Sequence, residues 1–201
     1  MNKRAALKVL ASLLGLSGTA GLLASCSENK AGFAAIDLTG ADYGRDFALT
    51  DHNGRARSLK DFAGKVVVLF FGYTQCPDVC PTTMVELVAV KKLLGRDGER
   101  VQGLFVTLDP QRDTPEVLKA YVENFDPSFL ALYTSPEKLQ ALAKEYKVYY
   151  NKVDGPTPTS YTLDHSAGSY VYDAMGKLRL YTRYGSGAAA LAADIKLLLQ
   201  Q

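Results

Sequence analysis

The stretch KVVVLFFGY, at residues 65–73, decides the fold class of this 201-residue chain. Its β-branched and aromatic side chains follow one another without alternation, which is typical of a central strand buried on both faces. A second run of this kind, VQGLFVTLD, occupies residues 101–109. Between the two runs, a helix is predicted from residues at three- and four-residue spacings, namely Met84, Leu87, Val88, Lys91 and Leu94. Two buried strands joined by a helix indicate an α/β protein.

Pairs of a hydroxyl residue and a proline predict the starts of two further helices. Thr114-Pro115 opens a helix that runs through Phe125, and Ser135-Pro136 opens one that runs through Lys147. An apolar helix from residue 188 closes the chain.

The remaining strands complete a mixed central sheet with helices on both faces. An Asn53-Gly54 turn predicts an N-terminal β-hairpin. Later strands are predicted at residues 129–134, 169–172 and 178–183.

The first residues have the features of an export signal. Lys3, Arg4 and Lys8 precede an apolar run at residues 9–24, and the sequence LASC ending at Cys26 resembles the lipobox of bacterial lipoproteins. We therefore expect a lipoprotein signal peptide at residues 1–25, a tether lipidated on Cys26 at residues 26–45, and one folded domain at residues 46–201. Such a chain would lie in the cell envelope, anchored to a membrane and facing the periplasm or extracytoplasmic side. An uncleaved N-terminal anchor is the alternative, and it would leave the chain on the same side of that membrane.

The charge of the chain argues against a nucleic-acid partner. The formal net charge is +2, and removal of the leader lowers the number of basic residues from 23 to 20, against 21 acidic residues. A near-neutral protein lacks the basic surface that nucleic acids attract.

A pair of cysteines follows the first buried strand, in the loop FGYTQCPDVCPTTM at residues 71–84. Loops at the carboxyl ends of strands hold ligands in α/β folds. Cys80 precedes Pro81 as Thr114 precedes Pro115, which predicts that Cys80 caps the helix and that the helix dipole stabilises its thiolate. The residues expected to shape this loop are Tyr73, Gln75, Pro77, Asp78 and Pro81.

Three interpretations of the Cys76–Cys80 pair remain open at this point. A structural disulfide would close a very short loop and stabilise little. A redox dithiol suits the position after a strand, although thioredoxin-type motifs have two intervening residues rather than three. A metal site needs a third ligand, and the chain has two histidines that could supply it. His52 lies in the 51–55 turn, where a solvated side chain is expected. His165 lies in the segment TLDHSAGSYVYD. A thiol peroxidase is disfavoured because residue 73 is Tyr rather than Thr or Ser.

Several motifs together resemble the Sco/SenC family of copper-binding, thioredoxin-like assembly proteins. They are DFALTD-x-x-G at residues 46–54, FGYTQCPDVCP, VTLDPQRDTPEVLKAYVENFDPSF at residues 106–129, and DHSAGSYVYD followed by Gly176. The resemblance implies a thioredoxin-like fold, and it implies that Cys76, Cys80 and His165 bind one copper ion. It also implies that the protein is a metallochaperone rather than an enzyme. Such a metallochaperone supplies copper, or reduces the cysteines of a copper site, during cytochrome c oxidase assembly.

The chemistry of this ligand set suits copper, since two thiolates favour Cu(I) and an imidazole binds either oxidation state. The partners expected are a copper-receiving protein such as a cytochrome c oxidase subunit, a thiol reductant protein, and the membrane through Cys26. The alternative functions are a periplasmic thiol-disulfide oxidoreductase, in which Cys76 attacks and Cys80 resolves, and protection against copper or oxidative stress. Asp109 and Asp164 are expected to be structural or capping residues rather than ligands.

Overall fold

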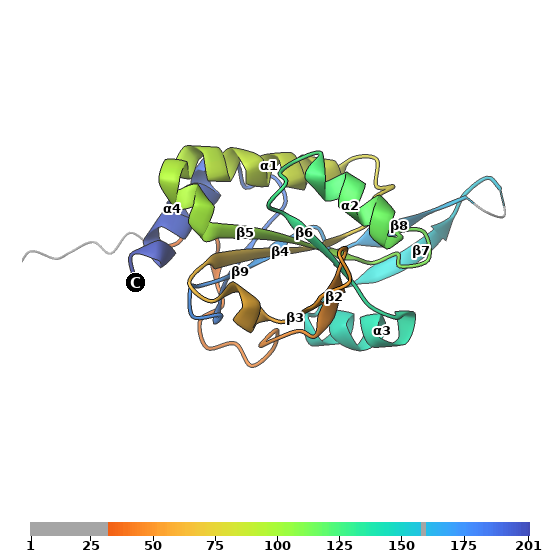
Figure 1. Ribbon diagram of the computed structural model, residues 1–201, viewed down its shortest axis with the longest axis horizontal. Coiled ribbons are helices and arrows are strands. Elements are labelled where there is room, and N and C mark those ends of the chain that lie inside the picture. Colours follow the sequence, from red (N-terminus) through yellow and green to blue (C-terminus); the bar gives the residue numbers. More distant parts are fainter. Residues whose placement is uncertain (1–31, 158–159) are drawn as a thin grey trace, which may run out of the picture. The chain divides into compact units, whose positions relative to one another are not determined.

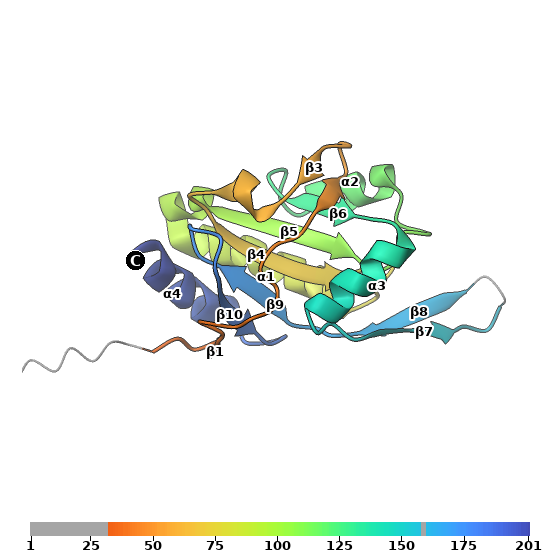
Figure 2. The same ribbon diagram turned by 90° about the horizontal axis from the view of Figure 1, so that it is seen from below.

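The computed structural model describes residues 32–157 and 160–201. The predicted signal peptide, the lipidation site Cys26 and the first part of the tether lie outside the described residues. Within them, the chain forms a mixed sheet with helices on both faces and a hairpin near its start, as predicted (Figures 1 and 2).

The centre of the sheet is parallel and fully buried. Strand β4 (Val66–Gly72) pairs with β5 (Val101–Thr107) along its whole length, and β5 pairs with β6 (Leu130–Tyr133). All residues of β4 and β5 are buried, which confirms the prediction from their uninterrupted apolar sequence. The parallel register brings Gly72 beside Thr107, so the loops that follow the two strands leave the sheet at the same edge.

Antiparallel strands extend the sheet on both sides. β9 (Ser169–Tyr172) pairs with β4, and β10 (Leu178–Thr182) pairs with β9. On the other side, β2 (Leu49–Asp51) pairs with both β6 and β3 (Ala56–Arg57). The β2–β3 connection is the predicted hairpin, and Gly54 in its turn has a positive φ of 80°, a conformation that glycine adopts readily.

Helices cover both faces of the sheet, as Figures 1 and 2 show. Three of them pack with the same apolar cluster: α1 (Val79–Leu94), α2 (Pro115–Glu123) and α4 (Ala188–Leu199). The opposite face packs against α3 (Pro136–Glu145) and the short 3-10 helix η1 (Leu59–Phe62). A second 3-10 helix, η2 (Gly95–Arg100), connects α1 to β5. Pro115 and Pro136 each occupy the start of their helix, as predicted.

The packed domain begins before Asp46. Strand β1 (Ile36–Asp37) pairs with the sheet edge at β10. Just ahead of it, the backbone N–H groups of Ala34 and Ala35 donate to the buried carboxylate of Asp194, each at 2.8 Å. These contacts hold part of the segment expected to be a tether against the domain, because an open strand edge and a buried carboxylate both need hydrogen-bond partners.

A second hairpin was not expected from the sequence. Strands β7 (Tyr150–Asp154) and β8 (Tyr161–His165) pair with each other and form a separate two-stranded sheet. Along β8 the burial alternates, so that Tyr161, Leu163 and His165 are partly buried while the residues between them are exposed. His165 is the last residue of this strand.

The prediction that His52 is a solvated turn residue is wrong. Its side chain is only 8% exposed, because β2 pairs with β6 and draws the turn onto the sheet. The backbone N–H of Ala131 donates to His52 Nδ1 at 3.1 Å, and the N–H of His52 donates to the carbonyl of Ala131 at 2.9 Å. His52 is therefore a structural residue of the β2–β6 junction.

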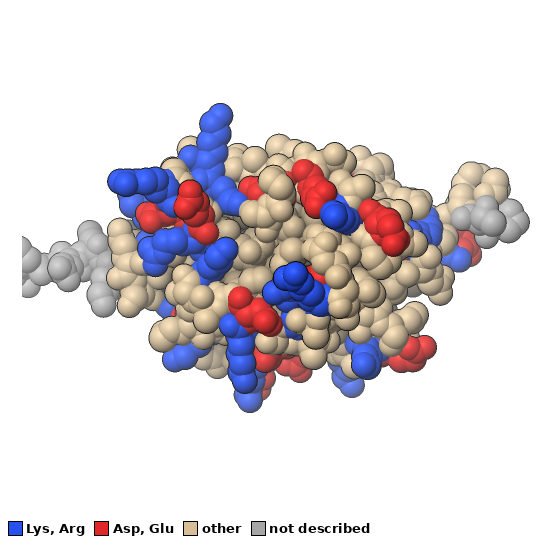
Figure 3. Space-filling model, viewed as in Figure 1, with Lys and Arg blue, Asp and Glu red and all other residues tan. Residues whose placement is uncertain are grey.

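Acidic and basic side chains are interspersed on the face of the domain drawn in Figure 3. None of the helices in residues 32–157 and 160–201 is long and apolar enough to span a bilayer.

The close packing above β5 leads to a test of the fold. A Cβ added at Gly103 would lie 2.7 Å from the Phe129 ring and 2.8 Å from the Leu87 side chain. Because both neighbours are buried, Gly103→Ala should lower the free energy of unfolding by about 1–3 kcal/mol, measured by urea denaturation. Gly32→Ala is the control, since nothing lies within 4 Å of its added Cβ. Equal denaturation midpoints for the two variants would contradict this account of the core.

The burial of His52 makes a second prediction, on acid stability. Burial lowers the pKa of His52 below its ordinary value. Below about pH 6.5 the unfolded chain therefore binds a proton that the folded chain does not, and the free energy of unfolding decreases as the pH falls. His52→Asn keeps an acceptor for the N–H of Ala131 but does not titrate. The variant should lose less stability than the parent between about pH 7 and about pH 5 in urea denaturation. Parallel losses would show that His52 is not responsible.

Candidate metal centre

Three residues from separate parts of the chain meet at one edge of the sheet. Cys76 lies in the loop after β4, Cys80 in the first turn of α1, and His165 at the end of β8. One ligand atom from each lies within 4.8 Å of the other two, and Cys80 Sγ is 3.4 Å from His165 Nε2. The two cysteines are free thiols. The spacing of 85 residues between Cys80 and His165 gave no indication of this proximity.

The start of α1 differs from the prediction. Asp78, not Cys80, is the N-cap residue, and the helix begins at Val79. Proline is tolerated throughout the first turn, where N–H groups have no partner within the helix, so Pro81 did not fix the position of the cap. Cys80 is thereby placed one position inside the helix, where its side chain turns toward the core.

The environment of Cys80 also reverses the expected effect on its thiol. The residue has 0% exposure, and burial raises the pKa of the Cys80 thiol far above its ordinary value. The expected stabilisation of its thiolate is therefore wrong for the metal-free protein, because loss of contact with water disfavours the charged form. The sulfur also lies close to β4, since a Cβ added at Gly72 would be 2.7 Å from it. Cys76, in contrast, is only partly buried.

His165 is held by aromatic rings and by a backbone carbonyl. Its ring lies edge-on to Phe70 and Tyr73, with centroid distances of 6.1 and 5.8 Å. Nδ1 is 2.9 Å from the carbonyl oxygen of Ser166, so Nδ1–H donates and the lone pair of Nε2 faces the sulfur of Cys80. Burial lowers the pKa of His165, while the Ser166 carbonyl and Asp164 act in the opposite direction. Burial thus favours the neutral imidazole, and the Ser166 hydrogen bond orients its Nε2 as a ligand.

A cleft of about 520 Å³ opens beside the three residues. Cys76 and His165 line it together with Pro77, Asp78 and Tyr149, whereas Cys80 does not. Tyr149 is 62% exposed at its rim. A metal ion or a partner's side chain approaching through this cleft would first meet Cys76 and His165.

The cysteine loop is fastened to the neighbouring loop by Asp113, which sequence reasoning missed. The carboxylate of Asp113 accepts hydrogen bonds from the backbone N–H of Thr74 at 3.1 Å, from its hydroxyl at 2.6 Å, and from the hydroxyl of Thr107 at 2.6 Å. Burial raises the pKa of Asp113, although all three hydrogen bonds favour its charged form. A charged residue soon after a buried parallel strand was the signal that could have identified it.

The two other acidic residues considered from the sequence have different surroundings. Asp109 is buried, pairs with Arg112 and accepts a hydrogen bond from the hydroxyl of Tyr161 at 2.8 Å. Asp164 is exposed on β8 and lines the cleft. Neither belongs to the group of three potential ligands.

The loop residues singled out from the sequence surround the two cysteines. Tyr73 packs against His165, Gln75 accepts a hydrogen bond from Arg112, and Pro81 lies in the first turn of α1. Asp78 occupies the N-cap position of that helix without a capping hydrogen bond from its side chain, and the hydroxyl of Tyr184 donates to its carboxylate at 3.4 Å.

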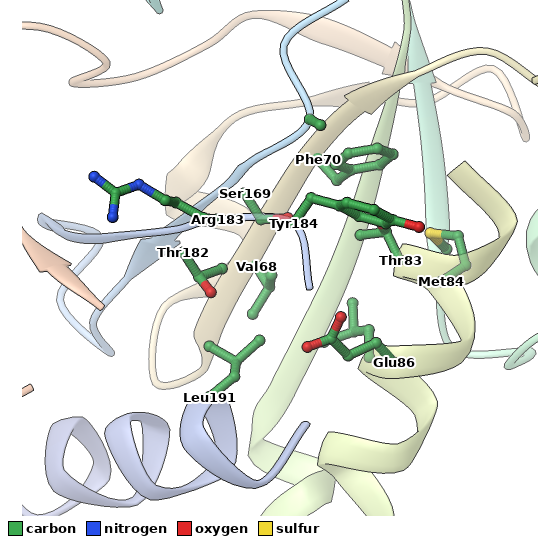
Figure 4. A pocket seen from close by; sticks show the side chains of 12 residues that line it. Val68, Phe70, Thr83, Met84, Glu86, Ser169, Thr182, Arg183, Tyr184 and Leu191 are labelled. Carbon is green, nitrogen blue, oxygen red and sulfur yellow. The ribbon is translucent and has the colours of Figure 1, made fainter. Parts of the chain in front are cut away.

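A second cavity, shown in Figure 4, lies between α1, α4 and the sheet. Apolar side chains line it, among them Val68, Phe70, Met84 and Leu191, and the side chain of Arg183 points away from it. Its volume of about 20 Å³ leaves room for one water molecule and nothing larger. Because the exposed Arg183 and Tyr184 also line it, it is a narrow surface crevice beside the core.

The donor set is chemically suited to copper. Two sulfurs are soft ligands, and a neutral imidazole nitrogen completes a three-coordinate group. Within the part of the chain that the structure describes, no fourth Cys, His, Asp or Glu joins this group, whereas structural zinc sites have four protein ligands. The two sulfurs lie within 4.8 Å of each other, so a disulfide, with its S–S bond of about 2.05 Å, requires them to approach.

Comparison with known proteins gives consistent results. A sequence model of the SCO1/SenC family matches residues 37–200. The SCO2-like protein of Rickettsia felis is 34% identical to this chain over 172 residues, which cover 84% of each protein.

Solved structures agree with this relationship. Bradyrhizobium japonicum ScoI with copper bound has a TM-score of 0.69 and 38% sequence identity, over 76% of this chain and 97% of that one. A SCO1/SenC family lipoprotein from Bacillus anthracis has a TM-score of 0.65 and 26% identity, over 76% of this chain and 92% of that one. The chain therefore has a thioredoxin-like fold and belongs to the SCO1/SenC family.

Proposed function

We propose that this protein is a copper metallochaperone that binds one copper ion through Cys76, Cys80 and His165 and supplies it during assembly of a cytochrome c oxidase copper site. The observation that carries this proposal is the meeting of the three donor atoms within 4.8 Å of one another. The related ScoI of Bradyrhizobium japonicum, which has copper bound in its solved structure, supports the choice of metal.

The arrangement suits a cargo that is to be passed on. Three protein ligands leave copper with an open side, and the 520 Å³ cleft lies on the side of Cys76 and His165. A ligand from the receiving protein can enter there and replace these two residues before the buried Cys80 is released.

Copper loading requires both sulfurs in the reduced form. A disulfide between Cys76 and Cys80 would remove two of the three ligands at once, so a thiol reductant protein must act first in an oxidising compartment. The partner thiolate attacks one sulfur of the disulfide and forms a mixed disulfide, and the other sulfur leaves as a thiolate. A second thiol of the partner then attacks the mixed disulfide, releases the dithiol and leaves the partner oxidised.

The protein is further proposed to be anchored to a membrane through lipidated Cys26 and to face the extracytoplasmic side. The lipobox-like sequence LASC and the apolar run at residues 9–24 support this location. The Bacillus anthracis relative is described as a lipoprotein.

Replacement of the imidazole ligand tests the metal-carrier proposal. His165→Ala should weaken copper binding by more than about 100-fold, because a direct ligand matters more than the outer-shell residues whose loss costs 10- to 100-fold. The measurement is competitive Cu(I) and Cu(II) titration of the reduced full chain. His52→Asn is the matched control, as it changes the other histidine, and it should keep the parent affinity. If His165→Ala binds copper as the parent does, the metal-carrier proposal fails.

A thiol-disulfide oxidoreductase is the second candidate function, because the two thiols are neighbours and only Cys76 lines the cleft. If Cys76 is the sulfur that exchanges with partners, it should react much faster than Cys80 with a small aromatic disulfide. In a Cys26→Ser background, which removes the third thiol of the chain, metal-free Cys76→Ser retains only the buried Cys80 and should react at least about tenfold more slowly at pH 8 than Cys80→Ser. Absorbance of the released aromatic thiol gives both rates. Equal rates would show that the cleft does not select Cys76.

A further inference from the structure

The hairpin that carries His165 is not part of the main sheet. β7 and β8 pair with each other, while the eight-stranded sheet contains the strand that leads to the cysteines (Figure 2). At its base, His165 is joined to β9 by residues 166–168, and the rest of the hairpin is held to the cysteine loop by side chains. Loss of such a connection would move a ligand without unfolding the domain.

Arg112 contacts both the hairpin and the cysteine loop. Its guanidinium lies over the ring of Tyr161, 3.5 Å from the centroid, and its Nη1 donates to the backbone carbonyl of Tyr161 at 2.9 Å. The same Nη1 donates to Gln75 Oε1 at 3.1 Å, in the cysteine loop. Nε donates to Asp109, and the hydroxyl of Tyr161 donates to the other carboxylate oxygen of Asp109 at 2.8 Å. One planar cation thus holds the hairpin and the cysteine loop together.

The surroundings make these contacts stronger than those of a surface ion pair. The side chain of Asp109 is 5% exposed and that of Arg112 is 17% exposed. A guanidinium that is stacked on a ring and hydrogen-bonded by two of its nitrogens has little freedom to reorient. The neighbouring Asp113 fixes Thr74, so a single short segment, residues 109–113, fastens the cysteine loop as well as the hairpin.

Strand β8 carries the effect from Tyr161 to His165. The two residues are four positions apart and lie on the same, partly buried face of the strand, with Leu163 between them. At about 3.3 Å per residue, they are roughly 13 Å apart along an extended backbone that is paired with β7. A displacement or rotation of Tyr161 is therefore transmitted to the imidazole.

We infer that Arg112 is a positioning residue for copper binding: with Asp109 it clamps Tyr161, and through β8 it keeps the imidazole of His165 beside the two sulfurs. This inference rests on the proposed function, since it assumes that His165 is a copper ligand. The hydrogen bonds of Arg112 go to Gln75, Asp109 and Tyr161, and none goes to the three potential ligands.

The test compares Arg112→Gln with a matched control in the full chain. Arg179 is an equally buried arginine, with 15% exposure, which pairs with the 5% exposed Asp173 and joins the surface residues Thr39 and Gln201. Arg112→Gln should weaken copper binding by about 10- to 100-fold in competitive titration. It should also change the nitrogen hyperfine coupling in the electron paramagnetic resonance spectrum of the Cu(II) form. Arg179→Gln should leave both unchanged, whatever it does to thermal stability.

A double-mutant cycle with His165→Ala distinguishes positioning from general destabilisation. If Arg112 acts through the imidazole, the double variant should bind copper as His165→Ala does. Additive losses, or parent-like binding by Arg112→Gln, would overturn the inference while leaving the copper function intact. If His165→Ala itself binds like the parent, the proposed function fails and the inference fails with it.

Tyr161→Phe keeps the test usable if Arg112→Gln does not fold. It removes only the hydroxyl that donates to Asp109 and retains the ring under the guanidinium. A weaker but measurable loss of copper affinity, again absent in the His165→Ala background, is expected. Unchanged affinity together with an unchanged Cu(II) spectrum would count against the clamp.

Discussion

The in-register parallel pairing of β4 with β5 is the constraint on which the rest of the site depends. It aligns Gly72 with Thr107, so the cysteine loop and the 109–113 segment leave the sheet side by side. Asp113 can then bind Thr74 and Thr107 at once, because its partners lie at the ends of two adjacent strands. The potential ligands therefore lie at the edge of a buried sheet, and the loop and helix that carry the two cysteines lie outside the sheet.

Two structural elements, the β4–α1 junction and the β7–β8 hairpin, meet at that edge. The cysteines belong to the strand-to-helix junction of the main domain, and the imidazole belongs to an independent hairpin. The ligands therefore differ in how they are held: Cys80 is buried in the first turn of α1, whereas His165 lies at the end of β8, three residues before β9.

Much of the fold could be predicted because its signals are local. β4 and β5 have unbroken apolar runs, α2 and α3 begin at a hydroxyl residue followed by proline, and the β2–β3 turn contains Asn53-Gly54. The β7–β8 hairpin could not be predicted, since its strands are short and mostly exposed and their contacts come from distant residues such as Arg112, 49 residues before Tyr161. The cysteines could be identified from their loop, whereas His165 followed only from the family resemblance. His52 was misjudged because a turn sequence does not reveal the strand that packs beneath it.

The unequal exposure of the two sulfurs also determines where chemical damage falls. Peroxide and other oxidants convert accessible thiolates to sulfenic acid, which thiols can reverse, and then to sulfinic and sulfonic acids, which they cannot. Cys80, with no surface in contact with water and a thiol that resists ionisation, is shielded from this sequence of reactions. Cys76 lines the cleft, so oxidants can reach its sulfur. An ion bound by both sulfurs, or a disulfide between them, would therefore protect the accessible sulfur of Cys76 from oxidation.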